Sequence, residues 1–134
     1  MPVVAVDRVR IPFVQRARLS LRDERREAFL LDLGLEGVFV ETREGLPLGA
    51  AVGLAFPLPG NAIPIEASGR VAWVRRAGGA TGLPAGVGVQ FVELREADET
   101  RLREFLEEYC RKSGRSRRFA RPWPAAEAVG GKKQ

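Results

Sequence analysis

A carboxylate and two glycines stand close together in an otherwise apolar run, Leu31–Val40, and they are the first candidates for chemistry in this chain. Asp32 comes first, and Gly34 and Gly37 follow it. Glycine inside a strand usually marks a bulge, a bend or a place where a ligand or another backbone comes close. Asp32 can meet a ligand there, or it can accept hydrogen bonds from neighbouring backbone amides as a turn residue. The sequence leaves both roles open for Asp32.

Arginines ahead of these glycines offer positive charge to the same place. They are Arg8, Arg10, Arg16 and Arg18. A guanidinium group forms two parallel hydrogen bonds with a phosphate or with the edge of a base, and it stacks on planar rings. Arg16 and Arg18 lie within a predicted strand, where solvated positions are favoured. Arg8 and Arg10 are therefore the better placed candidates for a ligand.

The elements that must position these residues follow a period of two, which is typical of strands. The predicted strands are Phe13–Leu21, then Ala28–Asp32 with Val38–Thr42 as one bent strand through the glycines, then Ala51–Pro57, Ile63–Arg75 and Val87–Phe91. Alternate residues of the fourth, from Ile63 through Val71 to Trp73, are expected to share one face. The segment Arg22–Glu27 is predicted to be a charged turn. The phenylalanines expected in the core are Phe39, Phe56 and Phe91. Short strands at this spacing favour an antiparallel barrel or sandwich.

The period changes to that of a helix near the C-terminal end. Leu102, Phe105, Leu106 and Tyr109 fall on one helix face, which predicts a helix over residues 97–112. Acidic residues occupy its first turn and basic residues its last, as the helix dipole favours. Residues 113–134 are rich in Arg, Lys, Gly, Ser, Pro and Ala, and we expect them to form a largely disordered basic tail.

The positive charge of the chain belongs to this tail. The 134 residues carry a formal net charge of +5. Residues 1–110 hold 14 Lys and Arg against 16 Asp and Glu, a net −2, whereas residues 111–134 hold 8 against 1, a net +7. Binding to a nucleic acid or an anionic membrane would therefore involve the tail. The chain has no apolar run long enough for a transmembrane helix, and its first ten residues do not resemble a secretory signal.

Catalysis finds no support in these residues. The chain has no histidine, so neither a histidine base nor a histidine metal ligand is expected. Cys110 is the only cysteine; it is expected to pack on the helix and it fits a reducing cytosol. The glycine-rich segment Gly78–Gly82 lacks the lysine and the following helix of a phosphate-binding loop. We therefore expect a cytoplasmic binding protein that is not an enzyme and has no metal or resident cofactor.

Five spaced segments carry a family resemblance: Gly37–Thr42, Leu46–Gly49, Phe56–Gly60, Gly69–Val74 and Gly86–Phe91. In this order they resemble the PilZ domain family, whose members are bacterial receptors for the second messenger cyclic di-GMP. The resemblance extends over residues 8–110 and implies a mainly β fold, a six-stranded antiparallel β-barrel with a C-terminal α-helix. On this basis residues 1–112 form one PilZ-like domain, with the barrel at 8–94 and the helix at 97–112, followed by the tail at 113–134.

The binding signature of that family matches in part. Its first element is Arg-x-x-x-Arg ahead of the first strand, and Arg8 and Arg10 lie near that place without that spacing. Its second element is Asp or Asn, any residue, Ser, two of any, Gly. Asp32 and Gly37 match this element, and Gly34 stands where the family has serine. The resemblance implies cyclic di-GMP as the ligand, held by the residues Arg8, Arg10, Asp32, Gly34 and Gly37.

The implied function is regulatory binding of cyclic di-GMP, with the signal passed to an unidentified protein partner. In this interpretation the arginine-bearing N-terminus folds over the nucleotide and changes what the partner meets. One alternative is a degenerate PilZ-type adaptor that binds a partner protein and no nucleotide. The other is binding of the 113–134 tail, in which Phe119 and Trp123 lie among basic residues, to nucleic acid or an anionic membrane.

Overall fold

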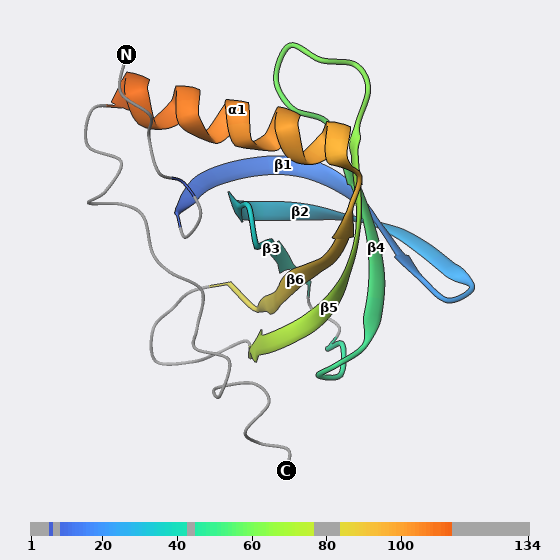
Figure 1. Cartoon of the computed structure of the whole chain (residues 1–134). Helices are drawn as coiled ribbons and strands as arrows, with labels where there is room; N and C mark the ends of the chain where they lie inside the picture. Colours follow the sequence, from blue (N-terminus) through green and yellow to red (C-terminus); the bar gives the residue numbers. More distant parts are fainter. Residues whose placement is uncertain (1–5, 7–8, 43–44, 77–83, 114–134) are drawn as a thin grey trace.

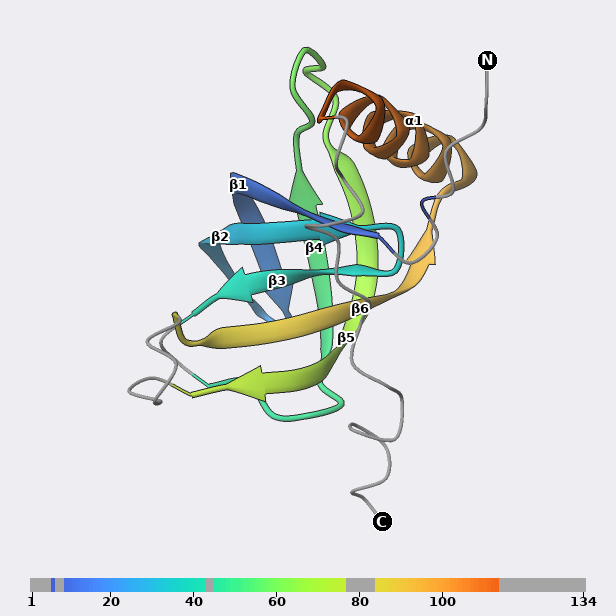
Figure 2. The ribbon, with the colours of Figure 1, turned by 90° about the vertical axis from the view of Figure 1, so that its left-hand side faces the viewer.

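The computed structural model describes residues 6, 9–42, 45–76 and 84–113. In this part of the chain six antiparallel strands close into a barrel, and one helix lies across one end of it (Figures 1 and 2). The elements are β1 (Arg10–Leu21), β2 (Glu24–Gly34), β3 (Gly37–Glu41), β4 (Ala51–Phe56), β5 (Ile65–Arg75), β6 (Gly86–Leu94) and α1 (Glu96–Ser113). Around the barrel the strand order is β1-β2-β3-β6-β5-β4. The fold expected from the sequence is confirmed.

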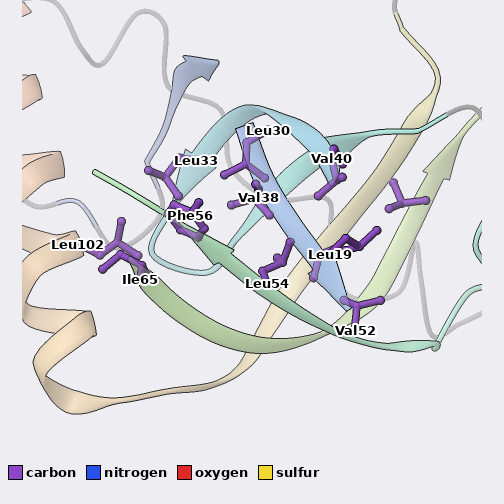
Figure 3. Packing of buried hydrophobic residues seen from close by; sticks show 14 of the residues in the cluster. Leu19, Leu30, Leu33, Val38, Val40, Val52, Leu54, Phe56, Ile65 and Leu102 are labelled. Carbon is purple, nitrogen blue, oxygen red and sulfur yellow. The ribbon is translucent and has the colours of Figure 1, made fainter. Parts of the chain in front are cut away.

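Alternate side chains of the strands point into the barrel and form its core (Figure 3). Among the fully buried strand residues are Leu19, Leu30, Leu33, Val38, Val40, Phe56 and Ile65. Helix α1 closes one end of this core with Leu102 and Leu106. Three phenylalanines were expected in the core. Phe56 lies in it and Phe91 packs half-buried against it, whereas Phe39 is buried on the outer side of the barrel.

Helix α1 is amphipathic. Cys110, expected as a packing residue, is buried on the barrel side of the helix. Glu99 and Glu108 lie on its exposed side. No helix within the described residues is both long enough and apolar enough to cross a membrane.

The glycine element is the turn of a hairpin, so the expectation of one bent strand through it is wrong. β2 ends at Gly34, β3 begins at Gly37, and Leu33 pairs with Val38 across the turn. An apolar run broken by two glycines fits a kinked strand and a tight hairpin equally well. Only the pairing partner distinguishes the two, and the sequence does not give it.

The turn predicted at Arg22–Glu27 is also shorter than expected. Arg22 and Asp23 alone separate β1 from β2, and Arg22 adopts a positive φ of 37°. Glu24 already pairs with Leu21 as the first residue of β2. Charged residues can continue a strand whose outer face meets solvent, so charge density alone does not mark a loop.

Buried Asp98 fixes helix α1 to the barrel. Its carboxylate lies 3.0 Å from Arg95 and 2.9 Å from Arg101, and it accepts a hydrogen bond of 3.2 Å from the backbone amide of Glu66 in β5. Burial alone would raise the pKa of Asp98. The Glu66 amide and the two arginines outweigh burial and hold the pKa below the usual value of an aspartate.

Replacing Asp98 with asparagine is expected to lower the free energy of unfolding by roughly 2 kcal/mol near neutral pH, because Arg95, Arg101 and the Glu66 amide lose a buried, charged acceptor. The folded-state pKa lies below the unfolded-state value, so this stabilisation is present above the unfolded pKa. It is lost as the pH falls through the folded pKa. Urea unfolding of both proteins, repeated at decreasing pH, should show the difference between them shrinking in acid. Glu99→Gln, at an exposed acid in the same helical turn, should change stability by less than about 0.5 kcal/mol. An Asp98→Asn deficit that persists unchanged at the lowest pH would contradict this role.

Candidate functional site

Side chains of β3 and β5 gather on one outer face of the barrel. Val38 and Val40 point into the core, so Phe39 between them points outward. The rings of Phe39 and Trp73 stack, with centroids 5.1 Å apart and planes inclined by 25°. Phe39 is only 1% exposed although it lies outside the barrel, because Trp73 and Arg75 cover it.

The expectation that Trp73 shares a face with Val71 is wrong. The pairing of β5 with β6 shifts register between these residues: Val71 lies opposite Val89, and Trp73 lies opposite Gly88. The additional residue in β5 moves every following side chain to the other face. Val71 therefore lies in the core, and Trp73 lies on the outer surface, half-buried.

Two glycines of β6 leave the space that the rings occupy. A Cβ atom on Gly88 would lie 2.1 Å from Nε1 of Trp73, and one on Gly86 would lie 2.5 Å from Cζ of Phe39. No side chain larger than hydrogen fits at either position while the rings stay in place. Gly86 and Gly88 thus form the floor on which this aromatic pair lies.

Arg10, the first residue of β1, reaches the same face. Its Nη2 lies 3.6 Å from Oδ2 of Asp32, and its guanidinium carbon lies 6.0 Å from the centroid of Trp73. The other carboxylate oxygen of Asp32 accepts a hydrogen bond of 3.0 Å from the backbone amide of Phe39. The side chain of Arg10 is 8% exposed and that of Asp32 20%, so the pair is largely shielded from solvent. Asp32 therefore accepts a backbone hydrogen bond across the β2–β3 hairpin and lies beside a cation, and its role toward a ligand stays a prediction.

Arg75 brings a second guanidinium group to the aromatic pair. Its guanidinium carbon lies 4.2 Å from the centroid of Phe39 and 5.7 Å from that of Trp73. Its Nε donates a hydrogen bond of 2.9 Å to the carbonyl of Pro84, which fixes its direction. Arg75 is not among the site residues predicted from the sequence; its two-residue spacing from Trp73 was the signal that could have found it.

The surroundings of Gly34 leave no room for the side chain of the family serine. A Cβ atom at this position would lie 2.6 Å from the carbonyl oxygen of Val9 and 3.3 Å from Cγ of Arg10. Arg10 and Gly34 face each other in the β1–β2 pairing. The start of β1 therefore packs directly on Gly34, and this contact holds Arg10 beside Asp32.

Restoring the family serine with Gly34→Ser is expected to destabilise the protein by roughly 1–3 kcal/mol, because the Val9 backbone must move. Gly53→Ser is the matched control, since a Cβ there would lie 3.4 Å from its nearest neighbour, Cβ of Ser20, an ordinary contact. Thermal and urea unfolding of the three proteins measure the difference. Equal stability of Gly34→Ser and the unmodified protein would show that β1 does not depend on this contact.

The structure brings three of the five predicted site residues into direct contact. Arg10, Asp32 and Gly34 meet as described, and Gly37 begins β3 as a buried residue opposite Gln90. Arg8 lies outside the described residues.

The other two arginines lie farther along β1. Arg16 and Arg18 are exposed there, as expected for solvated strand residues.

This outer face suits a planar, anionic ligand. It offers guanidinium groups for phosphates or base edges, a half-exposed indole for stacking, and a carboxylate that can accept from base N–H groups. Within the described residues, no group of three or more His, Cys, Asp or Glu side chains could hold a metal ion.

Comparisons with known proteins agree with the architecture. The family model of the PilZ domain matches residues 7–108. One similar solved structure is that of the Bacillus subtilis inhibitor of motility (MotI/DgrA), with 16% sequence identity and a TM-score of 0.66. The alignment covers 84% of this chain and 53% of that one, so this chain spans about half the length of that protein. At this identity the likeness shows the fold alone. The comparison with curated proteins gives no match.

Proposed function

The chain belongs to the PilZ domain family, and from this premise we propose that it is a regulatory module that binds cyclic di-GMP on the outer face formed by β2, β3, β6 and β5. Arg10, with Arg8 ahead of it, supplies guanidinium donors. Asp32 orients Arg10, Gly34 lets the start of β1 pack beside Asp32, and Gly37 lets the backbone come close to the ligand. The half-exposed ring of Trp73 supplies a stacking surface for one guanine.

The observation that supports this proposal most is the position of Arg10 beside Asp32 and Trp73. A guanidinium group carries five N–H donors in a planar fork, so Arg10 can bond Asp32 and still meet a phosphate or a base edge. Its position in β1 orders it before any ligand arrives, which lowers the entropy lost on binding. The arginine therefore differs from the expected flexible arm, since its strand already holds it in place.

The signal is proposed to pass to a protein partner in the cytosol. The similar solved structure is that of an inhibitor of motility. A ligand changes the affinity for a partner only if it binds the partner-competent state better. Bound nucleotide would favour the partner-competent state here by holding the start of β1 against the turn between β2 and β3.

Isothermal titration calorimetry with cyclic di-GMP tests the proposal, with GMP as the matched control. The expected result is one saturable binding event for cyclic di-GMP and a much weaker response to GMP, which carries one base and one phosphate. Absence of heat with cyclic di-GMP at high micromolar concentrations, in both low and moderate salt, would contradict nucleotide binding.

A second candidate function is a partner-binding adaptor that has lost the nucleotide. The observation that favours it is the close contact of Gly34 with Val9 and Arg10, which fills the space of the family serine. The same calorimetric experiment separates the two functions. Binding through the tail at 113–134 concerns residues outside the described part of the chain and stays a hypothesis.

A further inference from the structure

The barrel closes through a short seam between β1 and β4. The paired residues of β1 are Arg18, Leu19 and Ser20, opposite Ala55, Leu54 and Gly53 of β4, although β1 itself begins at Arg10. Among the described residues, no backbone hydrogen bond joins residues 11–17 of β1 to the chain that follows β4. This part of β1 is therefore a sheet edge in a barrel that is otherwise closed.

Proline keeps this edge open. If β4 continued in the same register, Pro57 would lie opposite Arg16, and Pro59 would follow it. Proline has no N–H to donate to a neighbouring strand, so β4 ends at Phe56, and Ala55 is its last residue paired with β1. The two prolines that follow β4 therefore interrupt its pairing with β1.

The edge borders a hollow of about 360 Å³ on the surface. Four consecutive residues of β1, Gln15–Arg18, line one side of it, and Pro57, Ala62 and Pro64 line the opposite side. Consecutive residues come from both faces of a strand, so the hollow reaches the backbone edge of β1. It also extends over the outer face of β1, where Glu27 of β2 and Ala55 of β4 line it. The side-chain amide of Gln15 donates to the carbonyl of Arg16 at 3.3 Å, in an exposed position that water or another chain can reach.

The side chains beside this edge specify the chemistry of an occupant. Val14 is 71% exposed, and Arg16 and Arg18 follow it on the same outward face. Arg16 has an exposed partner, Glu27, at 3.6 Å, whereas Arg18 forms no ion pair within the described residues. An antiparallel strand added opposite residues 14–17 would place two of its side chains opposite Arg16 and Val14, and the residue ahead of that stretch would lie beside Arg18, which already pairs with Ala55 of β4.

We propose that this edge of β1 accepts an extended, acidic segment of a partner protein as an additional strand, with the pattern acidic, any, acidic, any, apolar. Backbone hydrogen bonds to the edge supply affinity, and the two arginines supply specificity. The 114–134 segment of the chain itself is a poor occupant, because its six Lys and Arg residues against one Glu repel Arg16 and Arg18. The edge lies between β1 and β4, and the nucleotide face centres on β3 and β6, so the docking proposal does not rest on nucleotide binding.

The test uses two seven-residue peptides and the full-length chain labelled with ¹⁵N. One peptide is acetyl-Thr-Glu-Thr-Glu-Thr-Val-Thr-amide, and the other has lysine in place of both glutamates. The expected result is saturable shifts of the backbone amides of residues 14–18 with the acidic peptide, and binding of the lysine peptide that is at least about tenfold weaker. The double charge reversal Arg16→Glu, Arg18→Glu should invert this preference.

A matched double variant, Arg103→Glu with Arg111→Glu on helix α1, has the same change in net charge and should leave the preference unaltered. All four positions are surface positions, and circular dichroism confirms that each variant is folded. The proposal is overturned if both peptides bind equally, if the shifts map away from residues 14–18, or if the edge proves to be covered by a second copy of the chain or by residues 114–134. Calorimetry with cyclic di-GMP is unaffected by any of these outcomes, so the two proposals fail separately.

Discussion

Replacing Arg10 with alanine is expected to weaken cyclic di-GMP binding by about 100-fold, the effect of losing roughly two charge-assisted hydrogen bonds. The guanidinium group lies 3.6 Å from Asp32 and 6.0 Å from the centroid of Trp73, where a phosphate or a guanine edge would meet it. Calorimetry on the purified variants measures the change. Retained affinity in a folded Arg10→Ala protein would remove this residue from the site.

Two further variants separate the role of Arg10 in binding from its role in packing. Arg10→Lys keeps the charge and most of the stem but loses the planar fork, so binding should weaken by about tenfold with a smaller effect on stability. Arg111→Ala removes an exposed arginine of the helix, where it pairs with Glu108, and should leave nucleotide affinity unchanged. Equal losses in Arg10→Ala and Arg111→Ala, with affinity retained in Arg10→Lys, would indicate a general effect of net charge.

Replacing Gly88 with alanine is expected to displace the indole of Trp73 from the barrel surface. The new Cβ would lie 2.1 Å from Nε1 of that ring, so the ring must swing away and the stack on Phe39 is lost. We expect a loss of roughly 1–3 kcal/mol in stability and about tenfold weaker nucleotide binding, because the stacking surface moves. Tryptophan fluorescence should shift to longer wavelength as the indole enters water.

The fluorescence experiment needs a background in which Trp123 is phenylalanine, since the chain contains two tryptophans. Gly53→Ala is the matched control, a glycine in a strand of the same barrel whose added Cβ would make only an ordinary contact with Ser20. It should change neither the emission maximum nor the affinity. An unshifted emission maximum in Gly88→Ala would show that Trp73 does not lie over Gly88.

The period of the sequence was sufficient to predict the strands and the helix, and the resemblance to PilZ domains decided for a barrel over a sandwich. Alternation along β4 placed Leu54 and Phe56 inside, and the i, i+3, i+4 spacing placed Leu102 and Leu106 on the buried face of α1. These patterns follow directly from strand and helix geometry, and they survive errors of one or two residues at the element ends. The pairing of Arg10 and Asp32 on one face followed only from the resemblance to PilZ domains.

The sequence could not give the side of the sheet on which the aromatic residues lie. The strand register shifts between Leu30 and Asp32 in β2 and between Val71 and Trp73 in β5. After each shift, the side chains lie on the opposite face of the sheet from the one that simple alternation predicts. A bulge leaves little trace in a single sequence, and a slip of one residue moves each later side chain to the opposite face. Trp73 and Arg75 were therefore not assigned to the site, although Arg10 and Asp32 were.

An NMR titration of the ¹⁵N-labelled full-length chain with cyclic di-GMP tests most directly whether the nucleotide binds on the outer face of β2, β3, β6 and β5. The expected result is saturable shifts of the backbone amides of Arg10, Asp32 and Gly37 and of the indole N–H of Trp73. Residues of β4 should stay unchanged. Absence of shifts at saturating nucleotide, or shifts confined to β4 and its seam with β1, would contradict the proposed site.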